Sequence, residues 1–207
     1  MFSVDTARGF LPGKSIPPFF YDLRHKKSTV LLTGHSKIFS FSMKWQALLA
    51  LNGFEIHNID CAIRFNSYAI ANEAIRNNVP PEFIANSITL VRGFTPYQIL
   101  DAANDILRSF EKNRLFFILA PCKQFFDGDV SFDEGLFLLE KLIKVFRQIK
   151  AASIPLVIVE KESYSHPVFS SVYQKIKSLS SSVLVLRSGG ASGLARTPEF
   201  KHGQVFK

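Results

Sequence analysis

The chain has 207 residues, of which 47% are hydrophobic and 20% are charged, a composition that fits one globular domain with a sizeable core. No apolar run approaches the ~20 residues of a membrane-spanning helix, and the first residues lack the long apolar stretch of a signal peptide, so we expect no membrane partner. The formal net charge of +8 permits binding to nucleic acid or to an acidic protein but demonstrates neither.

Two cysteines, Cys61 and Cys122, lie inside apolar stretches. The chain has no C-x-x-C pair and no metal-ligand spacing, so we expect both to be buried free thiols that behave as small core residues. Unpaired thiols are typical of a reducing compartment, and the predicted location is therefore cytoplasmic.

The first part of the chain is organised around one strand and one helix. Residues 1–27 are rich in glycine and proline, so we expect an irregular lead-in. An apolar strand at residues 30–32 then ends at Thr33-Gly34, and a short polar loop follows. The next segment is predicted to be an amphipathic helix, closed by Asn52-Gly53, that carries Met43, Trp45, Leu48 and Leu49.

The rest of the chain alternates between strands and helices. Two helix starts are marked by side-chain caps, one at Thr95-Pro96 with Gln98 and one at the capping box Ser131-x-x-Glu134. Predicted strands cover residues 54–63 (ending near Asp60), 87–92, 114–120, 154–160 and 183–186. Predicted helices cover residues 66–78 (stopped by Asn77-Asn78 and Pro80-Pro81), 95–112, 131–149 and 168–179.

This alternation predicts a three-layer α/β fold with a mostly parallel central sheet. Residues 28–187 are expected to form its core, followed by a Gly- and Arg-containing tail at 188–207. In open sheets of this kind, ligands bind at the carboxyl ends of the strands. We therefore expect functional residues in the segments 34–42, 60–66, 120–130 and 160–167.

The strand, loop and helix at residues 28–51 match the frame of a phosphate-binding P-loop but not its chemistry. Counted from Gly34 along the template G-x-x-x-x-G-K-[ST], Phe39 stands at the second Gly, Ser40 at the Lys and Phe41 at the Ser/Thr. A bulky Phe blocks the close backbone approach that Gly allows, and Phe41 cannot bind Mg²⁺. The predicted nucleotide-binding loop is therefore degenerate, with Gly34, His35, Ser36, Lys37, Ser40 and Ser42 as its candidate residues.

Acidic residues near the strand ends leave two interpretations open. A P-loop ATPase also needs a carboxylate at the end of a buried strand, but residues 119–121 contain none. Asp60 could meet a ligand or cap a turn. A cluster further along could bind a metal, or be a solvated helix start: Asp127, Asp129, Asp133 and Glu134. We predict no catalytic residues and no metal site, because no Ser/His/Asp or Cys/His set is supported.

Two loops combine basic and aromatic side chains, as single-strand DNA binding requires. An alternative is that these aromatic residues pack back onto the core or onto a partner subunit. The candidates are Lys123, Phe125 and Phe126 in one loop, Lys161, Tyr164 and His166 in the other, and Arg187 and Arg196 towards the C-terminus.

The order of elements resembles the ATPase core of RecA/RadA-type recombinases over roughly residues 9–205. The matching pieces are STVLLTG, FEIHNID-CAIRF, ITLVRGFTPYQILDAANDIL, LFFILAP, IPLVIVEK and VLVLR with its Gly/Arg tail. In that family a Gly-Lys-Thr/Ser binds ATP and Mg²⁺, a strand-end Asp supports the metal, and two loops bind DNA. The family's polar sensor position holds Glu160-Lys161 here.

The resemblance implies a RecA-like P-loop fold with degenerate Walker A and Walker B motifs, and hence a pseudo-ATPase. We expect a non-catalytic accessory protein in DNA repair or recombination, with a protein partner or a second copy of the chain, and DNA as a further candidate. No cofactor is expected, although weak ATP binding is left open. The alternatives are an enzyme with unrelated chemistry at Asp60, Lys37 or Glu160, and a structural subunit of an oligomer.

Overall fold

The computed structural model describes residues 28–35, 37–108 and 114–186. Within these ranges it contains six strands, six α-helices and one short 3-10 helix. In chain order they are β1 (Thr29–Gly34), α2 (Ile38–Leu51), β2 (Glu55–Asp60), α3 (Ser67–Arg76), α4 (Pro81–Ala85), β3 (Ile88–Arg92), α5 (Pro96–Arg108), β4 (Arg114–Leu119), η1 (Lys123–Phe126), α6 (Phe132–Ala151), β5 (Leu156–Lys161), α7 (Phe169–Leu179) and β6 (Ser182–Leu186).

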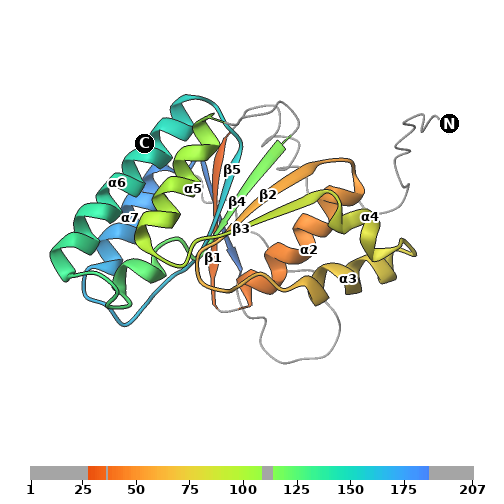
Figure 1. The fold of residues 1–207 in the computed structure, drawn as a ribbon, viewed down its shortest axis with the longest axis horizontal. Coiled ribbons are helices and arrows are strands. Elements are labelled where there is room, and N and C mark those ends of the chain that lie inside the picture. The colour runs from red at the N-terminus through yellow and green to blue at the C-terminus, as the bar shows by residue number, and fades with distance from the viewer. Residues whose placement is uncertain (1–27, 36, 109–113, 187–207) are drawn as a thin grey trace.

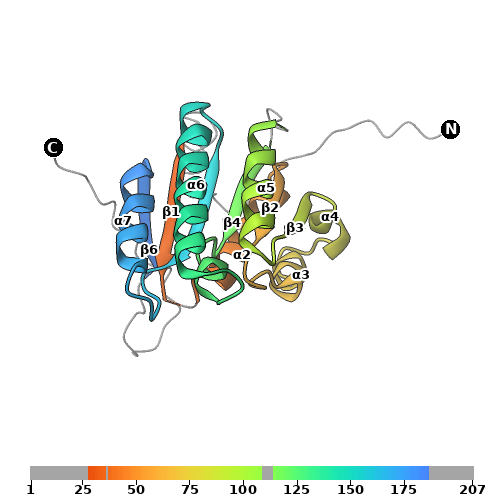
Figure 2. The same ribbon diagram turned by 60° about the vertical axis from the view of Figure 1, so that its left-hand side comes forward.

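The strands form one sheet in the order β3-β2-β4-β5-β1-β6, and every neighbouring pair is parallel. Helices α2, α3 and α4 cover one face, and α5, α6 and α7 cover the other (Figures 1 and 2). The predicted three-layer α/β fold is confirmed, and the sheet is parallel throughout the described residues. The predicted lead-in at residues 1–27 and tail at 188–207 lie outside the described residues.

The apolar runs of the central strands are explained by burial on both faces. Successive strand side chains point to opposite faces, so β4 sends Phe117 towards α2 and Phe116 towards α5 and α6. Both rings are completely buried. In β1, Leu32 and Leu31 divide between the same two layers. A strand that lies between two helical layers therefore needs apolar residues at every position.

The predicted helix starts at residues 95 and 131 are confirmed. The Thr95 hydroxyl accepts the N–H of Gln98 at 3.3 Å, and the Ser131 hydroxyl accepts the N–H of Glu134 at 3.3 Å. The Gln98 side chain accepts the N–H of Phe94 at 2.9 Å. Each cap satisfies a backbone donor that the first helical turn cannot.

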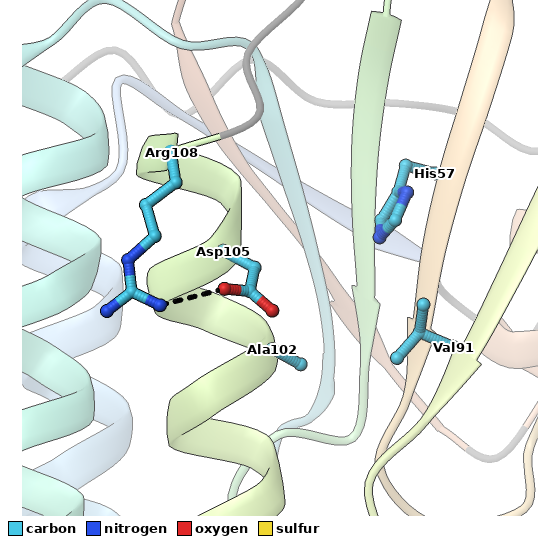
Figure 3. Close-up of a pocket in the computed structure, with 5 residues that line it drawn as sticks. All are labelled: His57, Val91, Ala102, Asp105 and Arg108. Carbon is cyan, nitrogen blue, oxygen red and sulfur yellow. Dashed lines mark hydrogen bonds and ion pairs between the residues drawn. The ribbon is translucent and has the colours of Figure 1, made fainter.

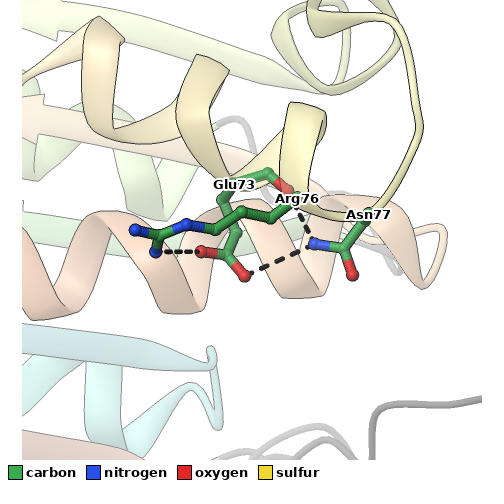
Figure 4. A network of polar contacts seen from close by, with 3 residues as sticks. All are labelled: Glu73, Arg76 and Asn77. Atoms are coloured by element: carbon green, nitrogen blue, oxygen red, sulfur yellow. Dashed lines mark hydrogen bonds and ion pairs between the residues drawn. The ribbon is translucent and has the colours of Figure 1, made fainter.

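The Asn-Asn stop predicted after α3 is also confirmed. Asn77 is the C-cap residue of α3. Its side-chain amide donates to the main-chain oxygen of Glu73 at 2.6 Å and to the Glu73 carboxylate at 3.3 Å, while Arg76 pairs with the same carboxylate at 3.5 Å (Figure 4). This local network closes the helix and leaves Asn78 to turn the chain with a φ of 55°.

One prediction about the helices was wrong: helix α2 is not amphipathic, because only Ser40 and Lys44 are exposed along it. Helix α3 ends before Pro80-Pro81, as predicted, and Pro81 is also the first residue of the short helix α4, which the sequence analysis did not predict. A proline fits the first helical position because that residue needs no N–H partner. No helix among the described residues has the length and apolar character needed to cross a membrane.

Candidate functional site

The carboxyl ends of the six strands meet at one edge of the sheet, where ligands bind in open α/β folds. The chain leaves the adjacent strands β1 and β5 in opposite directions, towards α2 on one face and α7 on the other. The same holds for β2 and β4, which lead to α3 and α6. The structure thus places the predicted segments after β1, β2, β4 and β5 along this edge.

The loop between β1 and α2 is only three residues long, residues 35–37. Gly34 has a φ of 142°, and a Cβ atom there would lie 2.4 Å from the main-chain oxygen of Leu186. The N–H of Ile38 donates to the main-chain oxygen of His35 at 3.0 Å, and the N–H of Lys37 lies 3.3 Å from the imidazole Nδ1 of His35. Of the candidate loop residues, Ser36 lies outside the described residues.

The remaining candidates of this loop are on the helix. Phe39 is 5% exposed within the first turn of α2, and Ser40 is exposed. The buried Ser42 donates its hydroxyl to the main-chain oxygen of Phe39 at 2.8 Å. The template positions for Gly, Lys and Ser/Thr therefore belong to a regular helix. The structure brings Gly34, His35 and Lys37 together in the short loop and separates Ser42 from them.

Arg64 is a basic residue at this edge that sequence reasoning did not single out. Its guanidinium carbon lies 5.4 Å from the centre of the Phe39 ring, within the range of a cation–π contact. Its Nε is buried and has no hydrogen-bond partner among the described residues. The segment 60–66 was the sequence signal, but nothing in it distinguished Arg64.

Asp60, at the end of β2, shapes the turn that follows. Its carboxylate accepts three main-chain N–H groups, those of Ala62 (3.3 Å), Arg64 (2.7 Å) and Phe65 (2.9 Å). The side chain is only 1% exposed. Of the two interpretations that the sequence left open, the turn role is the one the structure describes.

Glu160, at the end of β5, is completely buried and links two loops. Its Oε1 accepts the N–H of Lys161 at 2.9 Å and the hydroxyl of Tyr164 at 2.7 Å, and its Oε2 accepts the N–H of Cys122 at 3.0 Å. Burial raises the pKa of Glu160, and these three hydrogen bonds oppose the rise. Burial beside this carboxyl group also raises the pKa of Tyr164 well above its usual value, so Tyr164 stays a donor.

Both cysteines are buried free thiols, as predicted. Burial raises the pKa of Cys61 and of Cys122, and the nearby Glu160 raises both further. Neutral buried thiols are poor nucleophiles, which is consistent with a packing role.

The aromatic residues of the two candidate DNA-binding loops pack on one another. The ring of Phe126 stacks on His166 with centres 4.2 Å apart and meets Phe169 edge-on at 6.1 Å. The ring centre of Phe132, which the prediction did not include, lies 5.8 Å from that of His166. Phe125 is 4% exposed and belongs to the core, so it offers no ring face for a base.

The basic residues of these loops are partly engaged. The ammonium group of Lys123 pairs with Asp127 at 3.0 Å, and that of Lys161 lies 5.6 Å from the centre of the Tyr164 ring. The structure therefore brings four of the candidates together in one cluster of side chains around Phe169: Phe126, Tyr164, Lys161 and His166. Arg187 and Arg196 lie outside the described residues.

The acidic cluster at the start of α6 is an exposed helix start. Asp127, Asp129 and Asp133 are exposed, and Glu134 accepts a hydrogen bond from the hydroxyl of Tyr97. In the part of the chain that the structure describes, no group of three His, Cys, Asp or Glu side chains is arranged to hold a metal ion.

A separate pocket of about 270 Å³ lies between α5 and strands β2 and β3, away from the carboxyl edge (Figure 3). His57 faces Asp105 and Arg108 across an apolar floor of Val91 and Ala102. Burial lowers the pKa of His57, the nearby Arg114 lowers it further, and Asp105 opposes the change. Because Asp105 and Arg108 pair at 3.1 Å and are largely exposed, the pocket presents no unpaired buried charge.

Comparison with known proteins gives no family assignment. No protein-family model matches the chain, and no curated protein matches it significantly.

Proposed function

We propose that this chain is a non-catalytic, RecA-like accessory protein of DNA repair or recombination, which binds a protein partner and DNA. The observation that carries the proposal is the position of α2. Because this helix begins at Ile38, the residues that stand at the Gly, Lys and Ser/Thr positions of a P-loop lie on a helix, and Phe39 is buried. A loop of three residues offers few of the free N–H groups that cradle phosphates.

A P-loop ATPase also needs a carboxylate at the end of a buried strand to support Mg²⁺, and the residues that follow β4 do not supply one. Strand β4 is followed by Ala120 and Pro121, neither of which can hold Mg²⁺. The two buried carboxylates at the same edge, Asp60 and Glu160, are engaged by main-chain N–H groups and a Tyr hydroxyl. That engagement also weakens the alternative of an enzyme with other chemistry at these positions. The two unpaired thiols support a cytoplasmic location.

A groove on the α2–α4 face supports the protein-partner part of the proposal. It has a volume of about 320 Å³ and is lined mainly by apolar side chains from α3, α4 and β3, including Ile70, Ala85 and Leu90. The neighbouring helices also expose large apolar side chains: Tyr68 (79%) and Ile75 (62%) on α3, and on α4 Phe83 (49%), which lines a separate small pocket with Asn86 and Ser87. Several such residues around one groove are typical of a protein-binding surface, whether the partner is another protein or a second copy.

Two measurements on the full chain test the pseudo-ATPase and DNA parts of the proposal: a phosphate-release assay with ATP-Mg²⁺, and titration of fluorescent DNA with and without ATP. We expect no phosphate release from ATP-Mg²⁺, and salt-dependent DNA binding that ATP does not change. ATP turnover, or DNA binding that requires ATP, would overturn the pseudo-ATPase interpretation of the Gly34 loop.

Substitution of Ile75, which lies on α3 one turn after the groove residue Ala71, tests the partner surface. If the groove is an interface between copies, Ile75→Asp shifts the sedimentation coefficient towards the monomer. If the partner is another protein, that variant recovers fewer specific partners in cross-linking from cell extract. The matched control is Phe137→Asp, because Phe137 is 59% exposed on the opposite helical layer. Equal behaviour of the two variants would count against the groove.

A further inference from the structure

Helix α6 carries a row of basic side chains across its exposed face. Lys141, Lys144, Arg147 and Lys150 follow one another at intervals of three residues, and all four are exposed. Each step of three residues rotates the side chain by about 60° around the helix axis, so Lys141, Lys144 and Arg147 share the outer face and Lys150 is turned towards α7, where it contacts Leu179. We call these four residues the α6 basic stripe. No Asp or Glu occurs between Lys141 and Ala151. Helix α6 is the middle helix of the outer layer α5–α6–α7, so the stripe faces away from the sheet (Figure 2).

None of the four charges is neutralised by a carboxylate of the described residues. Lys150 donates to the main-chain oxygen of Leu179 at 2.6 Å, which leaves its charge intact. Lys141 lies 4.3 Å from the centre of the Phe137 ring. The neighbouring Glu140 is engaged with Lys175 of α7. Lys144 and Arg147 make no ion pair within the part of the chain that the structure describes.

The loops at the carboxyl edge are a poorer surface for phosphates. Lys123 is already paired with Asp127, and the start of α6 adds the exposed Asp129 and Asp133. These carboxylates repel a DNA backbone that approaches the loops. The part of α6 from Lys141 to Ala151 contains no carboxylate and is therefore the more favourable surface for phosphates.

We infer that the α6 basic stripe binds the phosphate backbone of double-stranded DNA, an inference that rests on the proposed function. The stripe spans about 13.5 Å along the helix axis. One exposed aromatic side chain, Phe137, adjoins the stripe at Lys141, and no exposed aromatic residue of α6 lies beside Lys144 or Arg147. A single ring offers no row of stacking platforms for successive unpaired bases, which favours duplex over single strand. The contacts are electrostatic, so binding is independent of sequence and depends steeply on salt.

The number of contacts sets the expected salt dependence. Because Lys150 is turned towards α7, three neutralised phosphates are expected, and they give a slope of log K against log[salt] of about −2.7 for duplex DNA. Replacing Lys144 and Arg147 by Gln removes two contacts, so the slope should fall to about −0.9. Affinity at about 50 mM salt should then fall on the order of a hundredfold, because each contact contributes roughly a factor of ten there.

The test is fluorescence anisotropy of a labelled duplex titrated with the full chain at several salt concentrations. The matched control is Lys123→Gln/Lys161→Gln, which removes the same two charges from the loops. The thermal midpoint of both variants checks that each is folded, because Lys144 and Arg147 are exposed whereas Lys123 and Lys161 are half-buried. We expect the α6 variant to lose affinity and slope and the loop variant to keep both.

Three results would overturn the inference, and they separate it from the proposed function. If only the loop variant loses binding, DNA is held at the carboxyl edge, and the proposed function stands while the stripe does not. If both variants lose affinity and slope equally, the effect is one of net charge alone and the stripe is not the binding site. If wild-type protein does not bind duplex DNA at low salt, the DNA part of the proposed function fails together with the inference.

Discussion

Replacement of Glu160 by Gln tests whether burial controls the protonation of this carboxyl group. Glu160 is the completely buried side chain that connects the loops after β4 and β5, through Cys122 and Tyr164. Its pKa is raised from 4.5, with burial as the largest cause. The folded state therefore holds the proton more tightly than the unfolded state does. Gln keeps the shape of the side chain and does not titrate.

The sign of the pH dependence follows from proton linkage. A group whose folded-state pKa is raised contributes stability that is fully present below its unfolded pKa, near 4.5. That contribution is lost as the pH rises through the folded-state pKa of Glu160. Each unit of pKa difference corresponds to about 1.4 kcal/mol of unfolding free energy. Gln adds a constant cost of about 1–3 kcal/mol, because its amide cannot accept the N–H of Cys122 if its oxygen keeps the hydroxyl of Tyr164.

Urea unfolding followed by the fluorescence of Trp45, the single Trp of the chain, measures both proteins from pH 4.5 to 8. We expect the stability difference between wild type and Glu160→Gln to shift in favour of the variant as the pH rises. Tyr164→Phe removes a donor that lowers the pKa of Glu160, so its pH-dependent loss should extend to higher pH. A difference that is constant with pH, or that shifts in favour of wild type, would refute the reasoning. The second result would mean that the three donors outweigh the cost of burial.

Three further substitutions test local features of the fold by thermal and urea unfolding. Gly34→Ala should lower stability by at least about 1–3 kcal/mol, because φ is 142° and the new Cβ would meet the main-chain oxygen of Leu186; an unchanged midpoint would contradict this. Ser131→Ala should cost about 1 kcal/mol through the lost cap of α6, whereas Ser131→Asp should retain most of it. Asp60→Ala should cost about 3 kcal/mol or more, because three main-chain donors lose their acceptor, and a loss under 1 kcal/mol would argue that water replaces it.

Sequence patterns predicted the strands and capped helices because the responsible forces are local. The apolar run at residues 114–120 predicts a doubly buried strand, and β4 is buried there on both faces. The caps at Thr95 and Ser131 bond to N–H groups three residues further on, a spacing that the sequence displays directly. The start of α2 was not predictable in this way, since Lys37 provides no side-chain cap.

The candidate site was harder to predict because its contacts are distant in the chain. Glu160 accepts from Cys122, 38 residues earlier, and the strand-end position alone does not reveal that its side chain turns inward. The same holds for Arg64, whose contact with Phe39 joins the loop after β2 to the first turn of α2. The aromatic loop residues were located correctly, but their mutual stacking depends on how two loops fold against each other. Patterns of residue type identify this edge without fixing which side chains face solvent.

The charges of α6 show which part of the net positive charge lacks a structural explanation. Helix stability favours acidic residues in the first turn and basic residues in the last, and Asp133 and Lys150 satisfy this rule. The effect falls off within one turn of each end, so it does not explain Lys141 and Lys144 in the middle of a helix of 20 residues. Glu140 lies one turn before Lys144 but is engaged with Lys175 of α7, and Lys144 makes no ion pair among the described residues. Because Lys141, Lys144 and Arg147 are like charges at neighbouring positions on the outer face, they repel one another, and an anionic partner explains their presence better than the stability of the fold.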